Sequence, residues 1–438
     1  MRFLSTLFAS LLIFIAPMAT AQSIIRDSEI EYALKEMARP ILSAAGLSTI
    51  RMRIIVIQDD SLNAFVVDAN HIFIHSGLIR RLDSAEQLQA VIAHEAAHIS
   101  NGHLGRRSMG LSSARSAAGI GLLLSAIAAS AGNSDAATAL AIGSNSVATR
   151  DFLAHTRGEE SAADQSAARY LARAGISPQA MVEVQELFES QQFNVSTRQD
   201  PYLRTHPLTS ERLRAARSYV ELFEVQLIDQ TETQYWYDRA RGKLDAWLGA
   251  PSYTLRRLEG RAATDIVLMQ RAVAYLRMPD FDAAIRNAHA LVALVPEDPY
   301  AHELLGQIHF EAGNFQSAAV SYARAVEILP RDALILTGLG RAYLAQGGAS
   351  NLREAVEILE RAYSIDPRQS RLLRELAFAY AQQGNNGMAS LMTAERYALS
   401  GNMSDAALHA QRASDQLPRG SVGWNRAQDV LVAANRAN

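Results

Sequence analysis

Two histidines flank a glutamate in the segment His94-Glu95-Ala96-Ala97-His98. The surrounding run from Gln87 to His103 carries apolar residues at helical intervals, which predicts a helix. Residues four apart lie on one face of a helix, so His94 and His98 can bind one zinc ion together. Glu95 then lies beside the open coordination position, where a carboxylate can accept a proton from the attacking water. We interpret the segment as a metal-binding and catalytic motif rather than as a chance pair of histidines.

A third metal ligand is expected in the acidic segment Arg157–Asp164, where alternating apolar and polar residues predict another helix. Glu160 and Asp164 are four residues apart, so both can face the same side. A carboxylate from a distant helix often completes a two-histidine zinc site, and Asp164 can hydrogen-bond a ligand imidazole. Spacing alone leaves Glu159 and Glu160 as alternatives. The segment can also be a solvated acidic helix start, which the helix dipole favours.

Local patterns predict the elements that must position these residues. They are a helix over Asp27–Ala44 with Ser28 as its candidate cap, a buried strand over Arg53–Gln58, and a hairpin of Ala64–Val67 and Ile72–Ile74. A sheet edge beside a metal can hold an extended peptide by main-chain hydrogen bonds, whatever its side chains. His71 and His75 of the hairpin are expected to face solvent or a neighbouring loop rather than the metal.

Composition restricts the class of protein and the kind of metal site. The chain of 438 residues contains no cysteine, so a metal must be held by histidines and carboxylates. Its formal net charge is -3 and no basic block stands out, which gives no support to nucleic-acid binding.

The first residues have the pattern of a secretory signal peptide. A basic residue, Arg2, precedes an apolar run over Phe3–Pro17 and a small-x-small site at Ala19-Thr20-Ala21. We expect cleavage after Ala21 and export of the chain. A membrane anchor is the alternative, but the apolar run is short for a bilayer span.

The segment Arg106–Arg150 is rich in Ala, Gly, Ser and Leu, and has an apolar core over Gly119–Ala128. Small residues and glycines favour a mobile helical lid over the active site. The polar residues that interrupt the apolar run argue against a full membrane span. Peripheral contact of residues 116–134 with a membrane surface is the alternative interpretation.

The paired motifs His94-Glu95-x-x-His98 and Glu160-x-x-Ala163-Asp164 resemble those of the HtpX and CAAX-prenyl-protease family of zinc peptidases. Further matching pieces are Asn63-Ala64-Phe65, Gly77-Leu78 and Thr156-Arg157. The resemblance implies endopeptidase activity with one zinc ion per chain, and it implies that Glu160 is the third ligand, as in gluzincins. Family members that act in membranes carry clear spanning helices, so this chain resembles the soluble, exported branch.

The segment Arg204–Arg212 resembles a Thr-His-Pro segment of periplasmic members of this family. There the histidine occupies the fourth zinc position and keeps the enzyme latent, and the arginine helps to bind the tetrahedral oxyanion. By position these residues are His206 and Arg212. The residues alone also allow a plain loop histidine before Pro207. The resemblance further implies a periplasmic location, with misfolded or misassembled outer-membrane proteins and their assembly machinery as partners.

A different pattern begins after about residue 246. Pro296 and Pro330 are 34 residues apart, and the residues between them follow the offsets of a tetratricopeptide repeat. The repeat positions are Gly306, Ala318, Tyr322 and Ala325, then Gly340, Tyr343, Ala355, Leu359, Ala362 and Pro367, with further units around Ala272–Ala284 and Ala394–Ala413. Stacked helix pairs form a superhelix with an elongated concave face. A helical bundle without a period is the alternative.

The sequence therefore predicts a mainly helical α+β chain. A signal peptide over residues 1–21 precedes a zincin-type metallopeptidase domain over residues 22–245, and a tetratricopeptide-repeat α-solenoid follows over residues 246–438. The expected function is zinc-dependent endopeptidase action on extended or misfolded chains, with Glu95 as the base, Asp164 as a supporting residue, and the repeats binding substrate or machinery. The alternative is a chaperone-like assembly factor whose protease site is mostly latent.

Overall fold

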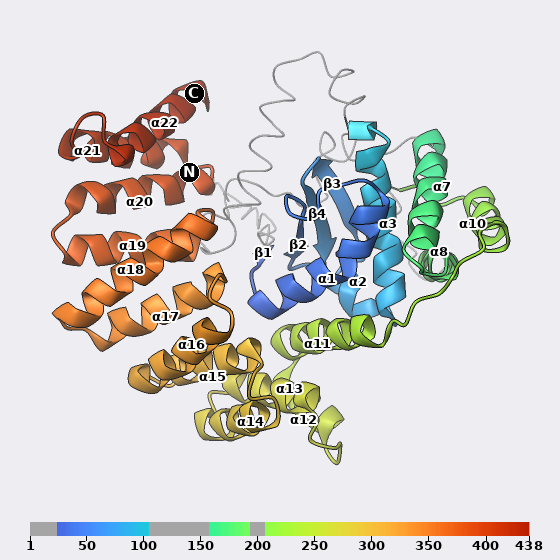
Figure 1. Cartoon of the computed structure of the whole chain (residues 1–438), viewed down its shortest axis with the longest axis horizontal. Coiled ribbons are helices and arrows are strands. Elements are labelled where there is room, and N and C mark those ends of the chain that lie inside the picture. The colour runs from blue at the N-terminus through green and yellow to red at the C-terminus, as the bar shows by residue number, and fades with distance from the viewer. Residues whose placement is uncertain (1–23, 105–156, 193–205, 438) are drawn as a thin grey trace, which may run out of the picture.

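The computed structural model describes residues 24–104, 157–192 and 206–437. The expected signal peptide over residues 1–21 and the expected lid around residues 116–134 lie outside these ranges. The described chain has an amino-terminal half built around a small sheet and a carboxy-terminal half of stacked helices (Figure 1). Within the described ranges, no helix combines the length and the apolar character needed to cross a membrane.

The sheet contains the expected strand and hairpin together with one short strand that the sequence did not predict. The strands are β1 (Ile24–Ile25), β2 (Arg53–Ile57), β3 (Ala64–Asp68) and β4 (His71–His75). Their order is β1-β2-β4-β3, with β3 and β4 antiparallel and β2 parallel to β4. The strand β3 is thus one edge of the sheet, and β1 is the other.

Helix α1 (Ser28–Ala44) packs against strand β2 of the sheet, and Asp27 caps the amino-terminal end of the helix. The carboxylate of Asp27 accepts a hydrogen bond from the Ile30 amide at 3.0 Å. The expectation that Ser28 caps this helix is wrong by one residue, because Asp27 has the extended backbone that an N-cap requires. The Ser28 hydroxyl instead donates a hydrogen bond to Asp332, in the other half of the chain.

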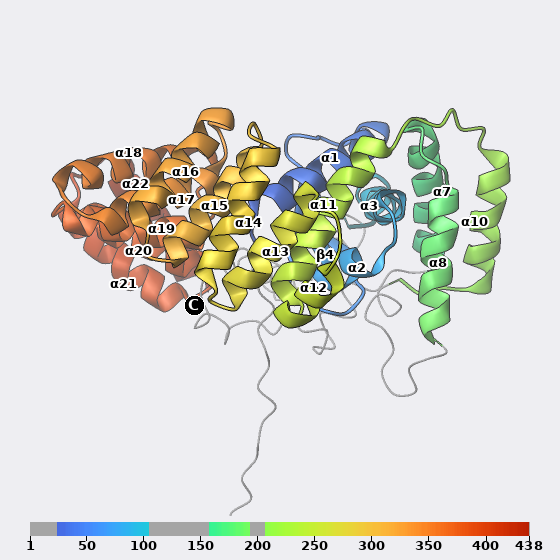
Figure 2. The same cartoon turned by 90° about the horizontal axis from the view of Figure 1, so that it is seen from below.

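Helix α3 (Ala85–Ser100) is the central helix of the amino-terminal half and is buried over most of its length. Ser84 caps it by accepting a hydrogen bond from the Gln87 amide at 3.2 Å. The short helix α2 (Ser76–Arg81) precedes α3 in the chain. On one side, α3 packs against α1 and the hairpin strands β3 and β4. On the other side lie α7 (Arg157–Arg173), α8 (Gln179–Gln192) and α10 (Ser210–Leu222) (Figures 1 and 2).

Helix α11 (Thr231–Leu248) runs across the expected domain boundary at residues 245 and 246. Tyr237 and Leu244 belong to the core of the amino-terminal half, whereas Ala246 belongs to a core cluster of the repeats. The two halves therefore share one continuous helix.

The carboxy-terminal half is an array of antiparallel helices, and we call α13 to α22 the solenoid (Figure 2). After α12 (Pro251–Leu258) come α13 (Asp265–Arg277), α14 (Phe281–Leu294), α15 (Pro299–Glu311), α16 (Phe315–Ile328), α17 (Ala333–Gln346), α18 (Ala349–Ile365), α19 (Ser370–Gln382), α20 (Asn386–Leu399), α21 (Met403–Gln416) and α22 (Val422–Ala437). The repeat-position alanines from Ala272 to Ala413 are fully buried, which confirms the predicted helix pairs. A Cβ at Gly306 would lie 2.9 Å from the Tyr322 ring, so close packing requires glycine there.

The solenoid curves beside β1 and the start of α1, and three aspartates spaced 34 residues apart hold it there (Figure 1). These contacts are Asp298 with Arg239, Asp332 with Ser28, and Asp366 with Arg26 and Arg53. One position of the repeat therefore contacts the amino-terminal half three times in succession.

Candidate metal centre

Four predicted residues meet at one point, and we call them the metal cluster. His94 and His98 come from α3, Glu160 from α7, and His206 from the residues just before α10. One nitrogen or oxygen atom of each lies within 4.8 Å of the others, and all four side chains are buried. Glu159, the alternative to Glu160, is outside the cluster.

The distances within the metal cluster suit a single bound ion. The Nε2 atoms of His94 and His98 are 3.1 Å apart, and His98 Nε2 lies 3.3 Å from Glu160 Oε1. His206 Nδ1 lies 3.0 Å from the same oxygen and 3.3 Å from His94 Nε2. Zinc is commonly bound in proteins by histidine nitrogens together with a carboxylate oxygen, so this donor set fits the expected metal.

Each histidine on α3 is oriented by a contact at its other ring nitrogen. His94 Nδ1 lies 3.0 Å from the Asp164 carboxylate, as the sequence suggested. His98 Nδ1 lies 2.8 Å from Nδ1 of His103, a buried residue that we did not single out. Gly102, with a φ of 69°, turns the chain at the end of α3 and brings His103 back toward His98. Such outer contacts fix the ring orientation that a metal requires.

Arg212 lies beside the metal cluster and joins Glu160, a member of the cluster, to Asp164, which contacts His94. Its guanidinium donates to both oxygens of Asp164, at 2.7 and 2.9 Å, and lies 2.7 Å from Glu160 Oε2. It also donates to the Pro207 carbonyl at 2.8 Å, which ties the loop of His206 to the same group. The sequence did not predict these contacts, which orient Asp164 and Glu160.

The buried charges at the site shift one another's pKa values. Burial opposes ionisation of Asp164, but the charge of Arg212 and the hydrogen bond from His94 keep its pKa below the usual value. Burial disfavours the charged form of His94, yet its contacts with Asp164 and Glu160 raise its pKa to about 10. Burial and the neighbouring cations lower the pKa of His98 well below its usual range.

Glu95 is fully buried, and its Oε1 lies 3.5 Å from Nε2 of His206. His206 thus lies close both to Glu95 and to Glu160, through its two ring nitrogens. The cavity beside these residues has a volume of about 20 Å³, enough for roughly one water molecule. This cavity, which His94, Asp164 and His206 line among the described residues, is too small to hold a peptide.

His71 and His75 lie away from the metal cluster. His71 Nδ1 contacts the Asp68 carboxylate at 2.7 Å. His75 is buried and lies 2.9 Å from the hydroxyl of Ser61. Both contacts are with neighbouring loops or turns of the hairpin, as expected.

Comparison with known proteins gives matches in both halves. Residues 25–220 match the model of peptidase family M48, and residues 269–333 match a tetratricopeptide repeat. The beta-barrel assembly-enhancing protease of Escherichia coli K12 is 26% identical over 406 residues, covering 91% of this chain and 82% of that protein. The putative beta-barrel assembly-enhancing protease of Vibrio cholerae is 28% identical, covering 66% of this chain and 59% of that protein. MamA of Desulfovibrio magneticus RS-1 matches 38% of this chain and 94% of its own, with 20% identity and a TM-score of 0.34.

Proposed function

Because residues 25–220 of this chain form a metallopeptidase domain of family M48, we propose that the protein is a periplasmic zinc endopeptidase for misfolded or stalled outer-membrane proteins. The metal cluster carries this proposal, because three imidazoles and a carboxylate converge beside a buried glutamate. The similarity to beta-barrel assembly-enhancing proteases supports the choice of substrate class.

In the proposed reaction, Glu95 accepts a proton from the attacking water and later gives one to the leaving amine. Zinc, when bound by His94, His98 and Glu160, supplies a Lewis acid that polarises the scissile carbonyl and acidifies the water. Asp164 holds His94 in the required tautomer, and Arg212 holds Asp164. An oxyanion role for Arg212 requires its guanidinium to leave at least one of its present carboxylate partners.

The substrate is proposed to bind as an extended chain along β3. This strand is an edge of the sheet, and it contacts α3, which carries His94 and His98. Main-chain hydrogen bonds to an edge strand do not depend on the side chains of the peptide. Such binding suits a protease that meets many unfolded substrates.

Metal analysis and cleavage of an unfolded protein test the proposal together. We expect one zinc ion per chain, cleavage that a chelator stops and zinc restores, and a loss of about 100- to 10,000-fold in Glu95→Gln with zinc retained. Glu159→Gln is the matched control, because Glu159 neighbours Glu160 but lies outside the metal cluster, and it should keep both metal and activity. Purified protein that neither contains nor takes up zinc would contradict the proposal.

We further propose that His206 holds the fourth zinc position and keeps the enzyme latent. The contact of 3.5 Å between His206 and Glu95 and the cavity of about 20 Å³ support this role. His206→Ala should raise basal cleavage of an unfolded protein, and adding Glu95→Gln should abolish the gain. Lower activity in His206→Ala with unchanged zinc content would make His206 a catalytic or substrate-binding residue instead.

A chaperone-like assembly factor with a mostly silent protease site is the second candidate. The closed metal cluster and the solenoid favour it. Cells whose only copy of this protein carries Glu95→Gln distinguish the two functions. Normal outer-membrane assembly in these cells would favour the chaperone, whereas accumulation of uncleaved outer-membrane proteins would favour the protease. Fractionation of the cells tests the periplasmic location.

A further inference from the structure

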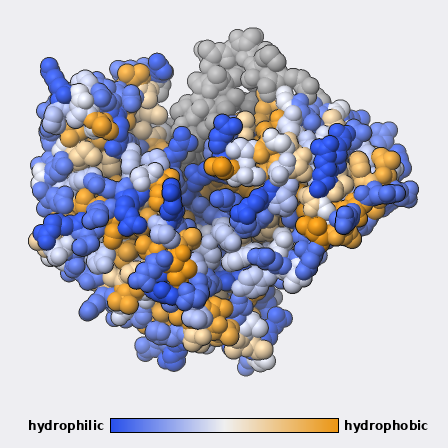
Figure 3. All heavy atoms as spheres, viewed as in Figure 1, coloured by the Kyte–Doolittle hydropathy of each residue, from blue (hydrophilic) through white to orange (hydrophobic). Residues whose placement is uncertain are grey.

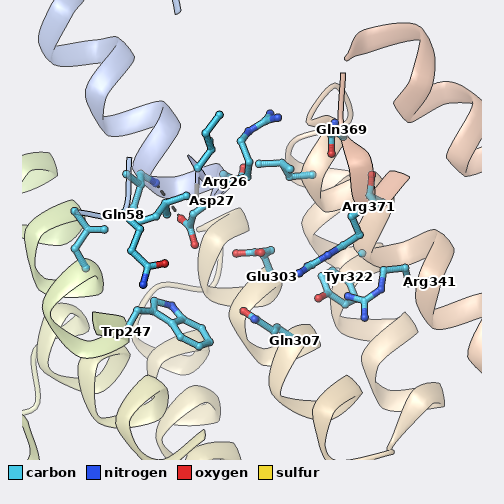
Figure 4. Close-up of a pocket in the computed structure, with 18 of the residues that line it drawn as sticks. Arg26, Asp27, Gln58, Trp247, Glu303, Gln307, Tyr322, Arg341, Gln369 and Arg371 are labelled. Atoms are coloured by element: carbon cyan, nitrogen blue, oxygen red, sulfur yellow. Dashed lines mark hydrogen bonds between the residues drawn. The ribbon is translucent and has the colours of Figure 1, made fainter. Parts of the chain in front are cut away.

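A cavity of about 410 Å³ lies between the solenoid and the first residues of the amino-terminal half (Figures 3 and 4). We call it the junction cavity; Ile25, Arg26, Trp247, Tyr322, Arg341 and Arg371 are among the residues that line it. Its volume falls within the range of about 300–1,000 Å³ that is common for ligand sites. It is much larger than the space at the metal cluster.

At one end of the junction cavity, the charged side chains pair with one another. The carboxylate of Asp27 lies 2.8 Å from the buried ammonium of Lys243. Burial raises the pKa of Glu303 to about 8, despite the opposing charge of Lys243 at 3.7 Å. Glu303 is therefore mostly uncharged at pH 7, and this end does not require an ion from a ligand.

The other end has an excess of positive charge. Arg374 donates to Glu375 at 2.8 Å, and Arg341 Nε lies 3.5 Å from the same carboxylate. Arg371 has no hydrogen bond or ion pair with any residue that the structure describes. Two arginines thus share one carboxylate while Arg371 has no carboxylate partner among the described residues, and Figure 4 shows Arg341 and Arg371 near each other in the cavity. An anionic ligand would relieve this excess, and guanidinium groups can bind a carboxylate through two parallel hydrogen bonds.

Partial removal from water and the positive charges of Arg341 and Arg374 also lower the pKa of Arg371, although part of this side chain is exposed to solvent. This shift means that the surroundings of Arg371 disfavour its positive charge as they stand. A bound anion would reverse that effect.

On the side where Figure 4 draws Trp247, beyond Asp27 and Glu303 from the arginines, the wall of the cavity suits an extended and partly apolar chain. Trp247 and Leu248 of α11 and Ile25 of β1 line it. Among the described residues, β1 pairs with β2 on one side only, so its other side can accept a further strand. A backbone edge, an apolar wall and a pair of arginines at one end together match the end of a polypeptide.

We propose that the junction cavity binds the free carboxyl end of an extended polypeptide, with Arg371 and Arg341 holding its terminal carboxylate. The residues before that end lie along β1 and against Trp247. A site of this size accepts the end of a chain rather than a folded domain. The proposal rests on the proposed function, because it describes how the peptidase selects unfolded substrates.

The test uses the full chain with Glu95→Gln, which binds peptides without cutting them. Fluorescence anisotropy measures the affinity for a short, unstructured, labelled peptide with apolar residues at its free carboxyl end. Amidation of that end should weaken binding by about tenfold or more, because a charged hydrogen-bond partner is lost. Arg371→Gln should weaken binding of the free peptide similarly and abolish the difference between the free and amidated peptides.

Arg374→Gln is the matched control, because Arg374 is exposed like Arg371 and carries the same charge, but is bonded to Glu375 and does not line the cavity. It should leave the affinity within about twofold, which corresponds to a small free-energy change. A melting curve checks that Arg371→Gln folds, and Arg341→Gln provides a second variant if it does not. Both arginine variants should lose the preference for the free carboxyl end.

Equal affinity for the free and amidated peptides would overturn the proposal. So would an amidated peptide with an internal aspartate that binds as tightly as the free peptide, because the carboxylate would then come from a side chain. The proposed function is measured separately, by chelator-sensitive cleavage with the unaltered chain. Cleavage without carboxyl-end preference defeats only this inference, whereas absence of zinc-dependent cleavage defeats the proposed function.

Discussion

Two buried clusters of polar residues differ in where their positive charge comes from. In the junction cluster, which consists of Asp27, Glu29, Arg239, Lys243 and Glu303, the chain supplies the cations itself. Lys243 is fully buried and lies 2.8 Å from Asp27 and 3.1 Å from Glu29. Arg239 bonds Glu29 and also reaches Asp298 of the solenoid. This cluster is an ion network that joins the two halves.

In the metal cluster, nitrogen atoms converge on one another as well as on a carboxylate. The Nε2 atoms of His94 and His98 face each other at 3.1 Å, while Asp164 and His103 hold the opposite sides of the two rings. Two imidazole nitrogens in contact can share at most one proton, so they suit an external cation better than each other. Convergent, oriented nitrogens therefore distinguish a metal site from a structural ion network.

The largest expected effect on stability is in the junction cluster. Lys243→Met should lower the free energy of unfolding by about 3–5 kcal/mol, because it leaves buried carboxylates without their cation. Chemical denaturation measures this loss, and zinc content should not change. Lys35→Met, at an exposed lysine of α1, is the control. Unchanged stability in Lys243→Met would mean that the junction cluster does not depend on its internal cation.

A smaller effect, on zinc affinity, is expected from the contact that orients His94. Asp164→Asn should weaken zinc binding by about 10- to 100-fold, because the contact that orients His94 loses its charge. Competition with a chromophoric chelator measures the affinity. Glu159→Gln should leave it unchanged. If zinc affinity survives Asp164→Asn, the orientation of His94 depends on the backbone of α3 instead.

The raised pKa of Glu303 predicts a pH dependence of stability. The folded chain holds this proton up to about pH 8, whereas an unfolded chain loses it near the usual value of 4.5. Folded protein therefore binds more protons in that window, and stability should fall as the pH rises through it, by about 1.4 kcal/mol per pH unit at most. Glu303→Gln should flatten this part of the profile. An unchanged slope in the variant would place the titrating group elsewhere.

The smallest effect is expected where the solenoid contacts β2 and the residues before α1. Asp366→Asn removes the charge that Arg26 and Arg53 share, at 2.8 and 3.2 Å, and should cost about 1 kcal/mol or less because these side chains are partly exposed. Thermal melting measures it, with the exposed Asp415→Asn as control. A loss similar to that of Lys243→Met would show that the halves are held together mainly through Asp366.

Much of the metal cluster could be predicted because its residues depend on local helical geometry. Helical spacing pairs His94 with His98 and allows Glu160 to pair with Asp164, but only the resemblance to the peptidase family favoured Glu160 over Glu159. His103 was not predicted, because its contact with His98 depends on the turn at Gly102 that ends α3. That glycine, followed directly by a histidine, was the available signal.

The sequence by itself determined the helices, the hairpin, the motif residues and the period of the repeats, because these follow from contacts between residues close along the chain. The tertiary structure decided which groups from distant segments meet. It pairs Asp164 with Arg212, sets β2 beside β4, and brings three equivalent aspartates of the solenoid to the start of the amino-terminal half. It also created the junction cavity. Such contacts depend on how the helices stack, which no local pattern in the chain specifies.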